Sequence, residues 1–271
     1  NEIIVNQLLS KNADVNVSNV EKDTPLLIAC RNNNSNITSQ LLNKNAKVNV
    51  SNKKNQNPLY YAVQFEDKEL IKKLIKKGAD VNVLSPNRDF PLIIACKSNN
   101  MDIIKILLNN NADVNVSNVE KYTPLILACK KGNEIIVNQL LSKNADVNVS
   151  NVEKDTPLLI ACRNNNSNIT SQLLNKNAKV NVSNKKNQNP LYYAVQFEDK
   201  ELIKKLIKKG ADVNVLSPNR DFPLIIACKS NNMDIIKILL NNNADVNVSN
   251  VEKYTPLILA CKKGNEIIVN Q

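Results

Sequence analysis

The sequence has 271 residues with 36 Lys and Arg against 25 Asp and Glu, which gives a formal net charge of +11, and it contains no histidine. Without histidine there is no His-based catalytic triad and no His-ligated metal site, and four isolated glycines cannot form a phosphate-binding loop. The sequence therefore predicts no enzyme, no cofactor, no metal and no small-molecule substrate. Its basic charge predicts weak attraction to acidic partners.

The apolar runs are short. The longest are pieces such as residues 92–96, well below the roughly eighteen residues that a membrane-spanning helix needs, so we expect no membrane insertion. The chain begins without a start methionine and in the middle of a repeating pattern. We interpret it as a window on a longer chain, and the lack of a visible signal segment says little about the compartment.

Cysteines and asparagines give opposite hints about the compartment. The six cysteines each follow the Ala of a Pro-Leu-x-x-Ala segment, at Cys30, Cys96, Cys129, Cys162, Cys228 and Cys261. Equivalent positions in stacked helices lie about 8 to 10 Å apart, too far for a disulfide, so we expect buried free thiols, which favours an intracellular location. N-x-Ser/Thr triplets would be glycan acceptors in a secreted chain, and in the first block they begin at Asn16, Asn33, Asn36, Asn49 and Asn115.

Two periods organise the sequence. Prolines recur every 33 residues, at Pro25, Pro58, Pro91, Pro124, Pro157, Pro190, Pro223 and Pro256. Residues 133–264 repeat residues 1–132 without a change, and residues 265–271 begin a third copy. A fixed period of this length predicts an all-α repeat solenoid of about eight stacked helix-turn-helix units. We expect blocks 1–132 and 133–264 to form one continuous body.

The chain opens with the second helix of a repeat whose first helix is missing. Apolar residues in the first nine positions form an amphipathic stripe, at Ile4, Val5, Leu8 and Leu9. Residues 12–23 follow as an extended loop that folds back on itself. This loop leads into the next repeat.

Thr24 and Pro25 then give the signals for the start of a first helix. Thr24 is placed to accept a backbone N–H as N-cap, and Pro25 occupies the first helical position. Leu26, Ile28 and Ala29 supply the buried side. Residues 31–34 break the helix, and a second amphipathic stripe resumes at Ile37, Leu41 and Leu42.

The cap residue changes along the block. It is Thr24 in one repeat and Asn57, Phe90 and Thr123 in the next three. Phe90 cannot accept a hydrogen bond, so we expect the helix after it to start about 1 kcal/mol less favourably, with Asp89 as an alternative cap.

These segments resemble the ankyrin repeat. The Thr-Pro-Leu-x-x-Ala helix, the Ile/Val-x-x-Leu-Leu helix and the Ala-Asp-Val-Asn start of the loop all recur at 33 residues, over the whole chain. The family's histidine in the first helix is replaced by apolar residues or tyrosine, so we expect apolar contacts there. The positions are Leu27, Tyr60, Ile93 and Ile126.

Asparagine takes the place of most of the family's turn glycines. In the four repeats of a block, one such turn position is occupied by Asn12, Asn45, Gly78 and Asn111. Another is occupied by Asn33, Glu66, Asn99 and Gly132. Because asparagine tolerates positive φ, we expect these turns to be kept. At the hairpin tip the glycine is replaced by Lys22, Asn55, Arg88 and Lys121, which argues against a positive φ there.

The resemblance implies that hairpin tips and first-helix faces bind protein partners. The corresponding candidates are Glu21, Lys22, Asp23, Lys54, Asn55, Gln56, Tyr60, Asn87, Arg88, Asp89, Glu120, Lys121 and Tyr122. Tyr60 and its neighbour Tyr61 are candidate anchors, and at least one of them is expected in the core.

A basic band is a second candidate surface. It comprises Lys68, Lys72, Lys73, Lys76 and Lys77 on the second helix predicted over residues 67–77, and it recurs at Lys200, Lys204, Lys205, Lys208 and Lys209. The band suits an acidic partner, but a solvated outer helix face explains it as well. No aromatic residues interleave for base stacking, so we expect no nucleic-acid binding.

Two functions remain open. The first is a structural scaffold, a segment of a long or filament-forming array whose partner is its own next block, end to end. It rests on the identical blocks and on apolar side chains expected to be exposed near the ends, at Val5, Leu8, Leu9, Leu257 and Leu259. The second is an adaptor that binds a separate protein through its tips, with block identity recording a recent duplication. An engineered repeat is a third possibility, which the irregular Asn-rich runs disfavour.

Overall fold

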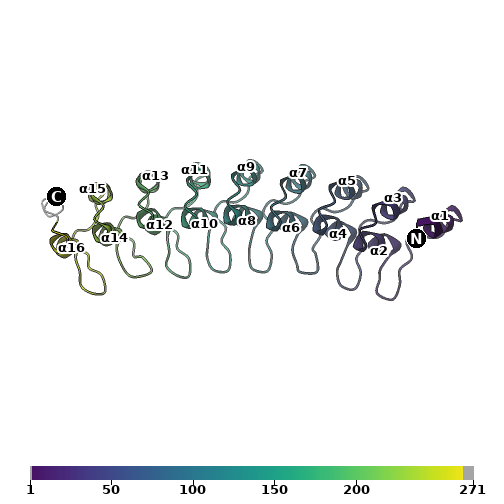
Figure 1. The fold of residues 1–271 in the computed structure, drawn as a ribbon, viewed down its shortest axis with the longest axis horizontal. Coiled ribbons are helices and arrows are strands. Elements are labelled where there is room, and N and C mark those ends of the chain that lie inside the picture. Colours follow the sequence, from purple (N-terminus) through teal and green to yellow (C-terminus); the bar gives the residue numbers. More distant parts are fainter. Residues whose placement is uncertain (1, 265–271) are drawn as a thin grey trace. The chain divides into compact units, whose positions relative to one another are not determined.

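The structure is a computed structural model that describes residues 2–264, and in this range it contains sixteen α-helices and no strand. The predicted start of a third copy at 265–271 lies outside the described residues. The helices alternate between two kinds, as Figure 1 shows. The first helices are α2 (Pro25–Arg31), α4 (Pro58–Gln64), α6 (Pro91–Lys97), α8 (Pro124–Lys131), α10 (Pro157–Arg163), α12 (Pro190–Gln196), α14 (Pro223–Ser230) and α16 (Pro256–Lys262). The second helices are α1 (Glu2–Ser10), α3 (Ser35–Asn43), α5 (Lys68–Lys76), α7 (Met101–Asn109), α9 (Glu134–Ser142), α11 (Ser167–Asn175), α13 (Lys200–Lys208) and α15 (Met233–Leu240).

Caps set the start of the first helices. The Thr24 hydroxyl accepts from the N–H of Leu27 at 3.3 Å, and the Asn57 carboxamide oxygen accepts from that of Tyr60 at 2.8 Å. Helix α6 begins after Phe90 without a side-chain cap, as predicted. Asp89 does not replace that cap, because its carboxylate pairs with Lys97 instead.

Residues with positive φ close the turns. Asn33 has a φ of 52°, its N–H bonds to Cys30 O, and the next N–H, of Asn34, bonds to Ala29 O. This arrangement closes the end of α2 as a glycine would. The same positive φ recurs at Glu66 and Asn99, which confirms that these turns are kept.

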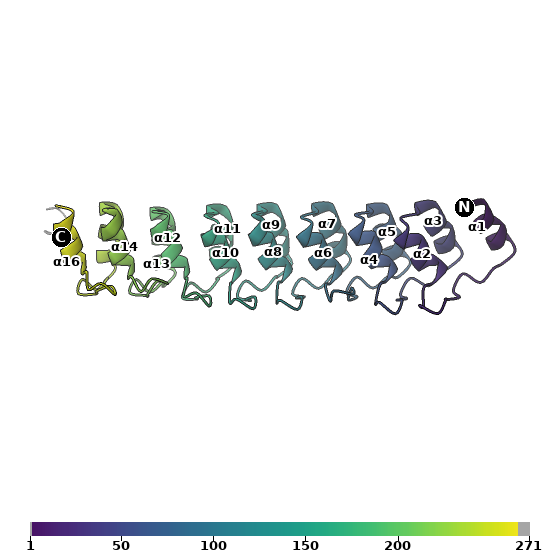
Figure 2. The ribbon, with the colours of Figure 1, turned by 60° about the horizontal axis from the view of Figure 1, so that its bottom comes forward.

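The chain folds as two compact units. The first holds the residues up to Ala128 together with Ser142–Ala145, and the second holds Cys129–Leu141 and the residues from Asp146 on. In the first unit α2, α4 and α6 each pack on the second helix that follows them, and these three first helices stack in series. The second unit repeats this order with α10, α12, α14 and α16. Within each unit the loops project beyond the first helices (Figure 2).

The core lies between the two helix layers of each unit. Leu26, Leu59 and Leu92 from the first helices are at most 1% exposed, and Ile71 and Leu74 from α5 are fully buried. At the positions of the family's histidine, Leu27, Ile93 and Ile126 are buried and Tyr60 is half-buried. Apolar contact therefore replaces the polar one, as the sequence predicted.

Exposure near the ends follows the prediction in part. Leu8 is 55% exposed and Leu257 is 56% exposed, whereas Val5 is half-buried. The prediction was wrong for Leu9 and Leu259, which are buried at 8% and 6%. Helices α1 and α16 pack against α3 and α14, respectively, so part of each apolar surface is already covered.

An asparagine ladder joins successive loops within each unit. It consists of Asn16, Asn49 and Asn82 in the first unit and Asn148, Asn181 and Asn214 in the second. The Asn49 carboxamide donates to Gly78 O and accepts from the N–H of Asp80, both at 2.8 Å. One side chain thus satisfies a donor and an acceptor of the next repeat.

We predict that Asn49→Ala lowers the free energy of unfolding by about 0.5 to 1.5 kcal/mol, because it removes two solvent-exposed hydrogen bonds to the next repeat, whose backbone groups can then bond to water. Urea denaturation of the whole chain measures this loss. Asn87→Ala, at an exposed tip, is the matched control and should change the midpoint little. Equal midpoints for the two variants would show that the ladder does not stabilise the stack.

Cysteine exposure provides a second prediction. Burial raises the pKa of Cys30, Cys96 and Cys162 to about 12 and that of Cys228 to about 11, whereas Cys261 is exposed. Because the thiolate is the reactive form, we expect a thiol-specific reagent to modify Cys261 promptly and the five buried cysteines only as the helices open. Titration at pH 8 with and without urea checks this. Prompt modification of several thiols in the folded chain would contradict the packing described.

Candidate functional site

Each hairpin tip of the first block is a turn closed by a polar side chain, which is exposed at Asn19 and buried at Asn52, Ser85 and Asn118. The Asn19 carboxamide oxygen accepts from the N–H groups of Glu21 and Asp23, both at 2.9 Å, and Asn52 and Asn118 act in the same way in later tips. In the third tip a shorter side chain suffices, since the Ser85 hydroxyl accepts from Asp89 N–H at 3.1 Å.

The backbone of the tip keeps a positive φ despite its side chains. The values are 60° at Lys22, 57° at Asn55, 58° at Arg88 and 58° at Lys121. The inference that loss of glycine argues against this conformation was therefore wrong. The Lys22 N–H bonds to Asn19 O at 2.9 Å, and this tight turn, locked by the Asn19 side chain, holds Lys22 in the left-handed region.

The structure divides the candidate binding residues by exposure. Most project from the tips, namely Glu21, Lys22, Lys54, Asn55, Asn87, Arg88, Glu120 and Lys121. Gln56, Tyr60 and Tyr122 are half-buried, and Tyr61 is a core residue at 4% exposure. Asp23 and Asp89 are buried at 7% each, so they support the tips rather than lie open to a partner.

The buried acids link the tip to the end of the first helix, eight residues on. Asp23 pairs with Arg31 at 2.8 Å and Asp89 with Lys97 at 2.7 Å. In the last described repeat an aromatic ring replaces the acid, and Lys262 Nζ lies 5.0 Å from the Tyr254 ring centroid. In these repeats the residue before the cap therefore holds a cation at the helix end, where it also complements the helix dipole, whereas Gln56 and Gln64 occupy the two positions around α4.

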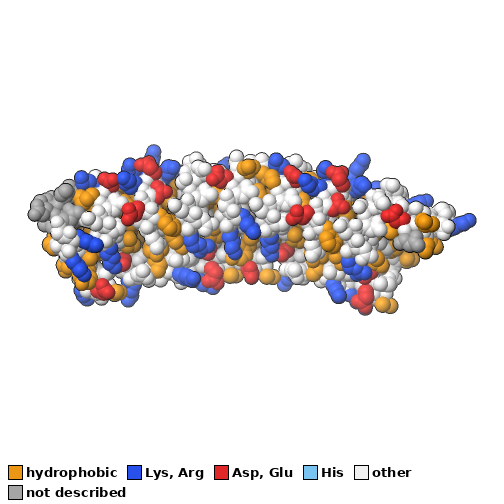
Figure 3. All heavy atoms as spheres, viewed as in Figure 1, with side chains coloured by type: hydrophobic (Ala, Val, Ile, Leu, Met, Phe, Trp, Pro, Cys, Tyr) orange, Lys and Arg blue, Asp and Glu red, His pale blue; other side chains and the backbone are white. Residues whose placement is uncertain are grey.

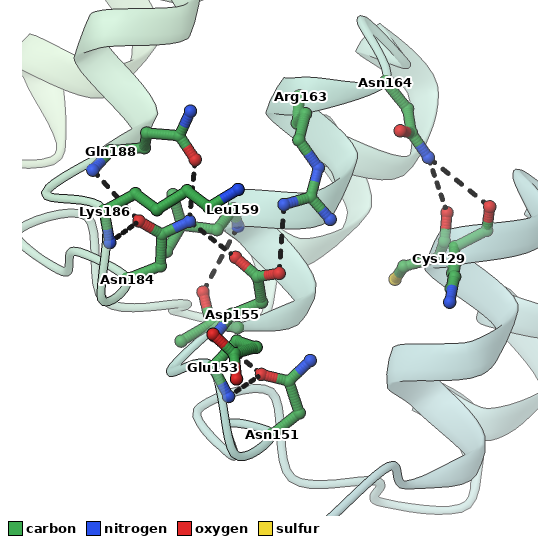
Figure 4. A network of polar contacts seen from close by, with 12 residues as sticks. Cys129, Asn151, Glu153, Asp155, Leu159, Arg163, Asn164, Asn184, Lys186 and Gln188 are labelled. Atoms are coloured by element: carbon green, nitrogen blue, oxygen red, sulfur yellow. Dashed lines mark hydrogen bonds and ion pairs between the residues drawn. The ribbon is translucent and has the colours of Figure 1, made fainter. Parts of the chain in front are cut away.

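Asp23 also reaches the next repeat, whereas Asp89 makes no such bond. Asn52 Nδ2 donates to Asp23 at 2.8 Å and to Gln56 at 2.9 Å. Figure 4 shows the equivalent network in the second unit, where Asp155 accepts from Arg163 at 3.0 Å and from Asn184 at 2.9 Å. This network fixes the spacing of neighbouring tips, and with it the surface that a partner would meet.

The basic band is largely engaged in contacts of its own. Lys68 pairs with Asp102 on α7, Lys72 with Glu69 at 2.8 Å, and Lys73 donates to Ser39 at 2.9 Å. Lys77 reaches Asn45 at 3.3 Å, and Lys76 is exposed. The neighbouring Asp102 carboxylate raises the pKa of Lys68, so the ammonium stays charged. Figure 3 shows acidic and basic side chains intermixed along the edge of the second helices, which fits a solvated face.

Sequence reasoning missed the exposed valines of the tips. Val20 is 82% exposed and Val119 is 63% exposed, in loops that are otherwise polar. The signal was a β-branched apolar residue at a tip position where the other repeats of the block carry Lys53 or Pro86.

Residues 2–264 contain no group of three or more Cys, Asp or Glu side chains that could hold a metal ion. Within the same residues no helix is long and apolar enough to cross a membrane.

The fold and the hairpin tips define the class of protein. It is a tandem-repeat protein built from capped helix pairs that are joined by projecting hairpin loops. A family model described as ankyrin repeats (3 copies) matches residues 1–85, 64–151, 136–217 and 196–271. The chain therefore belongs to the ankyrin repeat family, whose repeats are protein-interaction scaffolds and generally not enzymes. No individual curated protein gives a significant match to the chain.

The buried Asp23 at the tip leads to a prediction about how the stability of the fold depends on pH. Burial alone would raise the pKa of Asp23, but hydrogen bonds from Asn52 and Arg31 and the charge of Arg31 outweigh it and hold this pKa below its ordinary value of 3.8. An acid whose pKa is lower in the folded state stabilises the fold above its unfolded pKa, and this contribution is lost as the pH falls through the folded value.

We expect Asp23→Asn to lower the free energy of unfolding by about 1 to 3 kcal/mol at pH 7, because Arg31 loses a charged partner. The gap between variant and unmodified chain should shrink as the pH falls below 3.8 and through the lowered pKa of Asp23, because Asp23 itself then becomes protonated. Urea midpoints from pH 7 to pH 2.5 measure this. The exposed Asp14→Asn is the control, and a gap that is constant with pH would contradict the assignment.

Proposed function

We propose that this chain is a non-enzymatic structural scaffold, a segment of a long repetitive or filament-forming ankyrin array whose neighbours are further copies of the same block. The observation that carries the proposal is the identity of the two 132-residue blocks, down to the contacts between their repeats. The Asn49 bond to Gly78 and the Asn181 bond to Gly210 both measure 2.8 Å.

Selection for one tailored binding surface would favour different residues in successive repeats. Two blocks without a single difference suggest instead that length and period are what matter. Contacts that cross from one repeat to the next are head-to-tail, and such contacts propagate into open helical assemblies when the rotation does not close. Continuous arrays therefore follow from the same interface used repeatedly.

Exposed apolar side chains support the idea that more of the same sequence is the partner. Ile4 and Leu8 of α1 are 53% and 55% exposed, whereas their copies in α9, Ile136 and Leu140, are at most 1% exposed. Leu257 of α16 is 56% exposed and its copy Leu125 is 1% exposed. A further copy of the repeat would bury such side chains, at roughly 1.5 to 3 kcal/mol each.

Association of the purified chain tests the proposal. Sedimentation and electron microscopy at rising concentration should show linear growth, and Leu8→Lys with Leu257→Lys should abolish it, because both positions lie on the proposed contact faces. Val20→Lys, at an exposed tip away from those faces, is the matched control and should assemble normally. Two results together would overturn the proposal. The purified chain would stay monodisperse at every concentration, and chains made of several linked blocks would also remain single particles.

The alternative function is an adaptor that recognises a separate protein through its tips. The exposed Val20 and Val119 favour it, because an apolar side chain among charged ones suits a protein interface. Identical tips would then bind one partner once per block and gain avidity. In the same experiment, discrete particles instead of regular fibres would favour this function.

A further inference from the structure

The basic band on α5 has two sides with different charged neighbours. On the side of α7 the lysines are accompanied by acids, since Lys68 pairs with Asp102, and Lys72 pairs with Glu69 at 2.8 Å. On the side of α3 there is a cavity of about 270 Å³ between the two helices. It is lined by Ser39, Leu42, Asn43, Lys73, Lys76 and Lys77, and none of these lining residues is acidic.

The three lysines of this cavity, here called the lysine cluster, form no ion pair among the described residues. Lys73 Nζ donates to Ser39 Oγ at 2.9 Å, and Lys77 Nζ donates to Asn45 Oδ1 at 3.3 Å, so both partners are neutral. Lys76 has no partner in the described part of the chain, and all three side chains are exposed. Three positive charges therefore lie within about one turn of α5 without a paired acid.

The lysine cluster does not help the helix that carries it. Lys73 is followed by Lys76 and Lys77 at i+3 and i+4, the spacings at which like charges on a helix repel each other. The fold does not require lysine there, because other second helices have Gln40 or Ile106 at the position of Lys73. An anion from outside the chain would remove this repulsion.

The second block repeats the arrangement. Lys205 Nζ donates to Ser171 Oγ at 3.0 Å, and Lys209 Nζ donates to Asn177 Oδ1 at 3.4 Å. Lys208, the copy of Lys76, is likewise exposed. Each cluster lies within one folded unit, so each one is complete without the other.

We propose that the lysine cluster binds an acidic segment of a partner protein, whose Asp or Glu carboxylates pair with the ammonium groups above the cavity. Lysines act as point charges, and the second helices carry no arginine, whose planar fork would favour one phosphate group of fixed geometry. Lys44 precedes Lys77 by one repeat at the equivalent position and is also exposed. Positive charge therefore continues along α3, which suits an extended segment with several carboxylates.

The proposed site lies apart from the surface that the hairpin tips offer. Within each unit the second helices and the hairpin loops lie on opposite sides of the first helices (Figure 1). The site is also independent of end-to-end assembly and recurs once every 132 residues. This proposal can therefore fail while the scaffold proposal stands, and the reverse is also true.

Fluorescence anisotropy of a labelled oligoglutamate peptide, titrated with the full chain, tests the site. We expect saturable binding that weakens as salt is added. Replacing the cluster lysines by glutamine in both blocks should weaken binding about tenfold, the combined loss expected for a few exposed ion pairs. This cluster variant carries Lys73→Gln, Lys76→Gln, Lys77→Gln, Lys205→Gln, Lys208→Gln and Lys209→Gln. It should keep or slightly raise the urea midpoint, because it removes repulsion between like charges.

A matched control variant removes the same number of charges from exposed lysines of the hairpin tips. It carries Lys22→Gln, Lys53→Gln, Lys54→Gln, Lys154→Gln, Lys185→Gln and Lys186→Gln. The control should bind the peptide nearly as tightly as the unmodified chain. No saturable binding overturns the proposal, and so does an equal loss in the two variants, because net charge alone would then attract the peptide. Tighter binding of a thymidine oligonucleotide of equal charge would also overturn it and would assign the cluster to nucleic acid.

Discussion

The fold depends on side chains of one repeat that complete the hydrogen bonds of the next. Asn49 satisfies both Gly78 O and Asp80 N–H, and Asn52 reaches back to Asp23, which itself holds Arg31. Without the neighbouring repeat the buried Asp23 would lose its partner Asn52, and the apolar faces of the helices beside it would be open to water. Each repeat is therefore stable only as a member of a stack.

This dependence accounts for the asparagine-rich composition. Asparagine closes turns at positive φ in Asn33, caps helices in Asn57, locks a tip in Asn19 and bridges repeats in Asn49. Its carboxamide both donates and accepts, and it tolerates the left-handed region, so one residue type serves four local needs.

Much of the fold could be predicted from the sequence because its signals are local and repeated. Pro25 at the first helical position, the cap at Thr24 and the stripe at Leu41 and Leu42 each specify an element within a few residues. The tip conformation at Lys22 could not be predicted, because it depends on a hydrogen bond from the backbone to the Asn19 side chain. The burial of Asp23, and the burial of Leu9, depend on packing against a neighbouring repeat.

If stability comes from contacts between copies, it must grow with the number of copies. The most direct measurement is the free energy of unfolding in urea for chains of one, two and three identical 132-residue blocks. The account predicts a midpoint and an unfolding free energy that rise with each added block, since every block adds the same set of contacts between repeats. Equal midpoints for one, two and three blocks would contradict it, because each block would then be a self-sufficient domain.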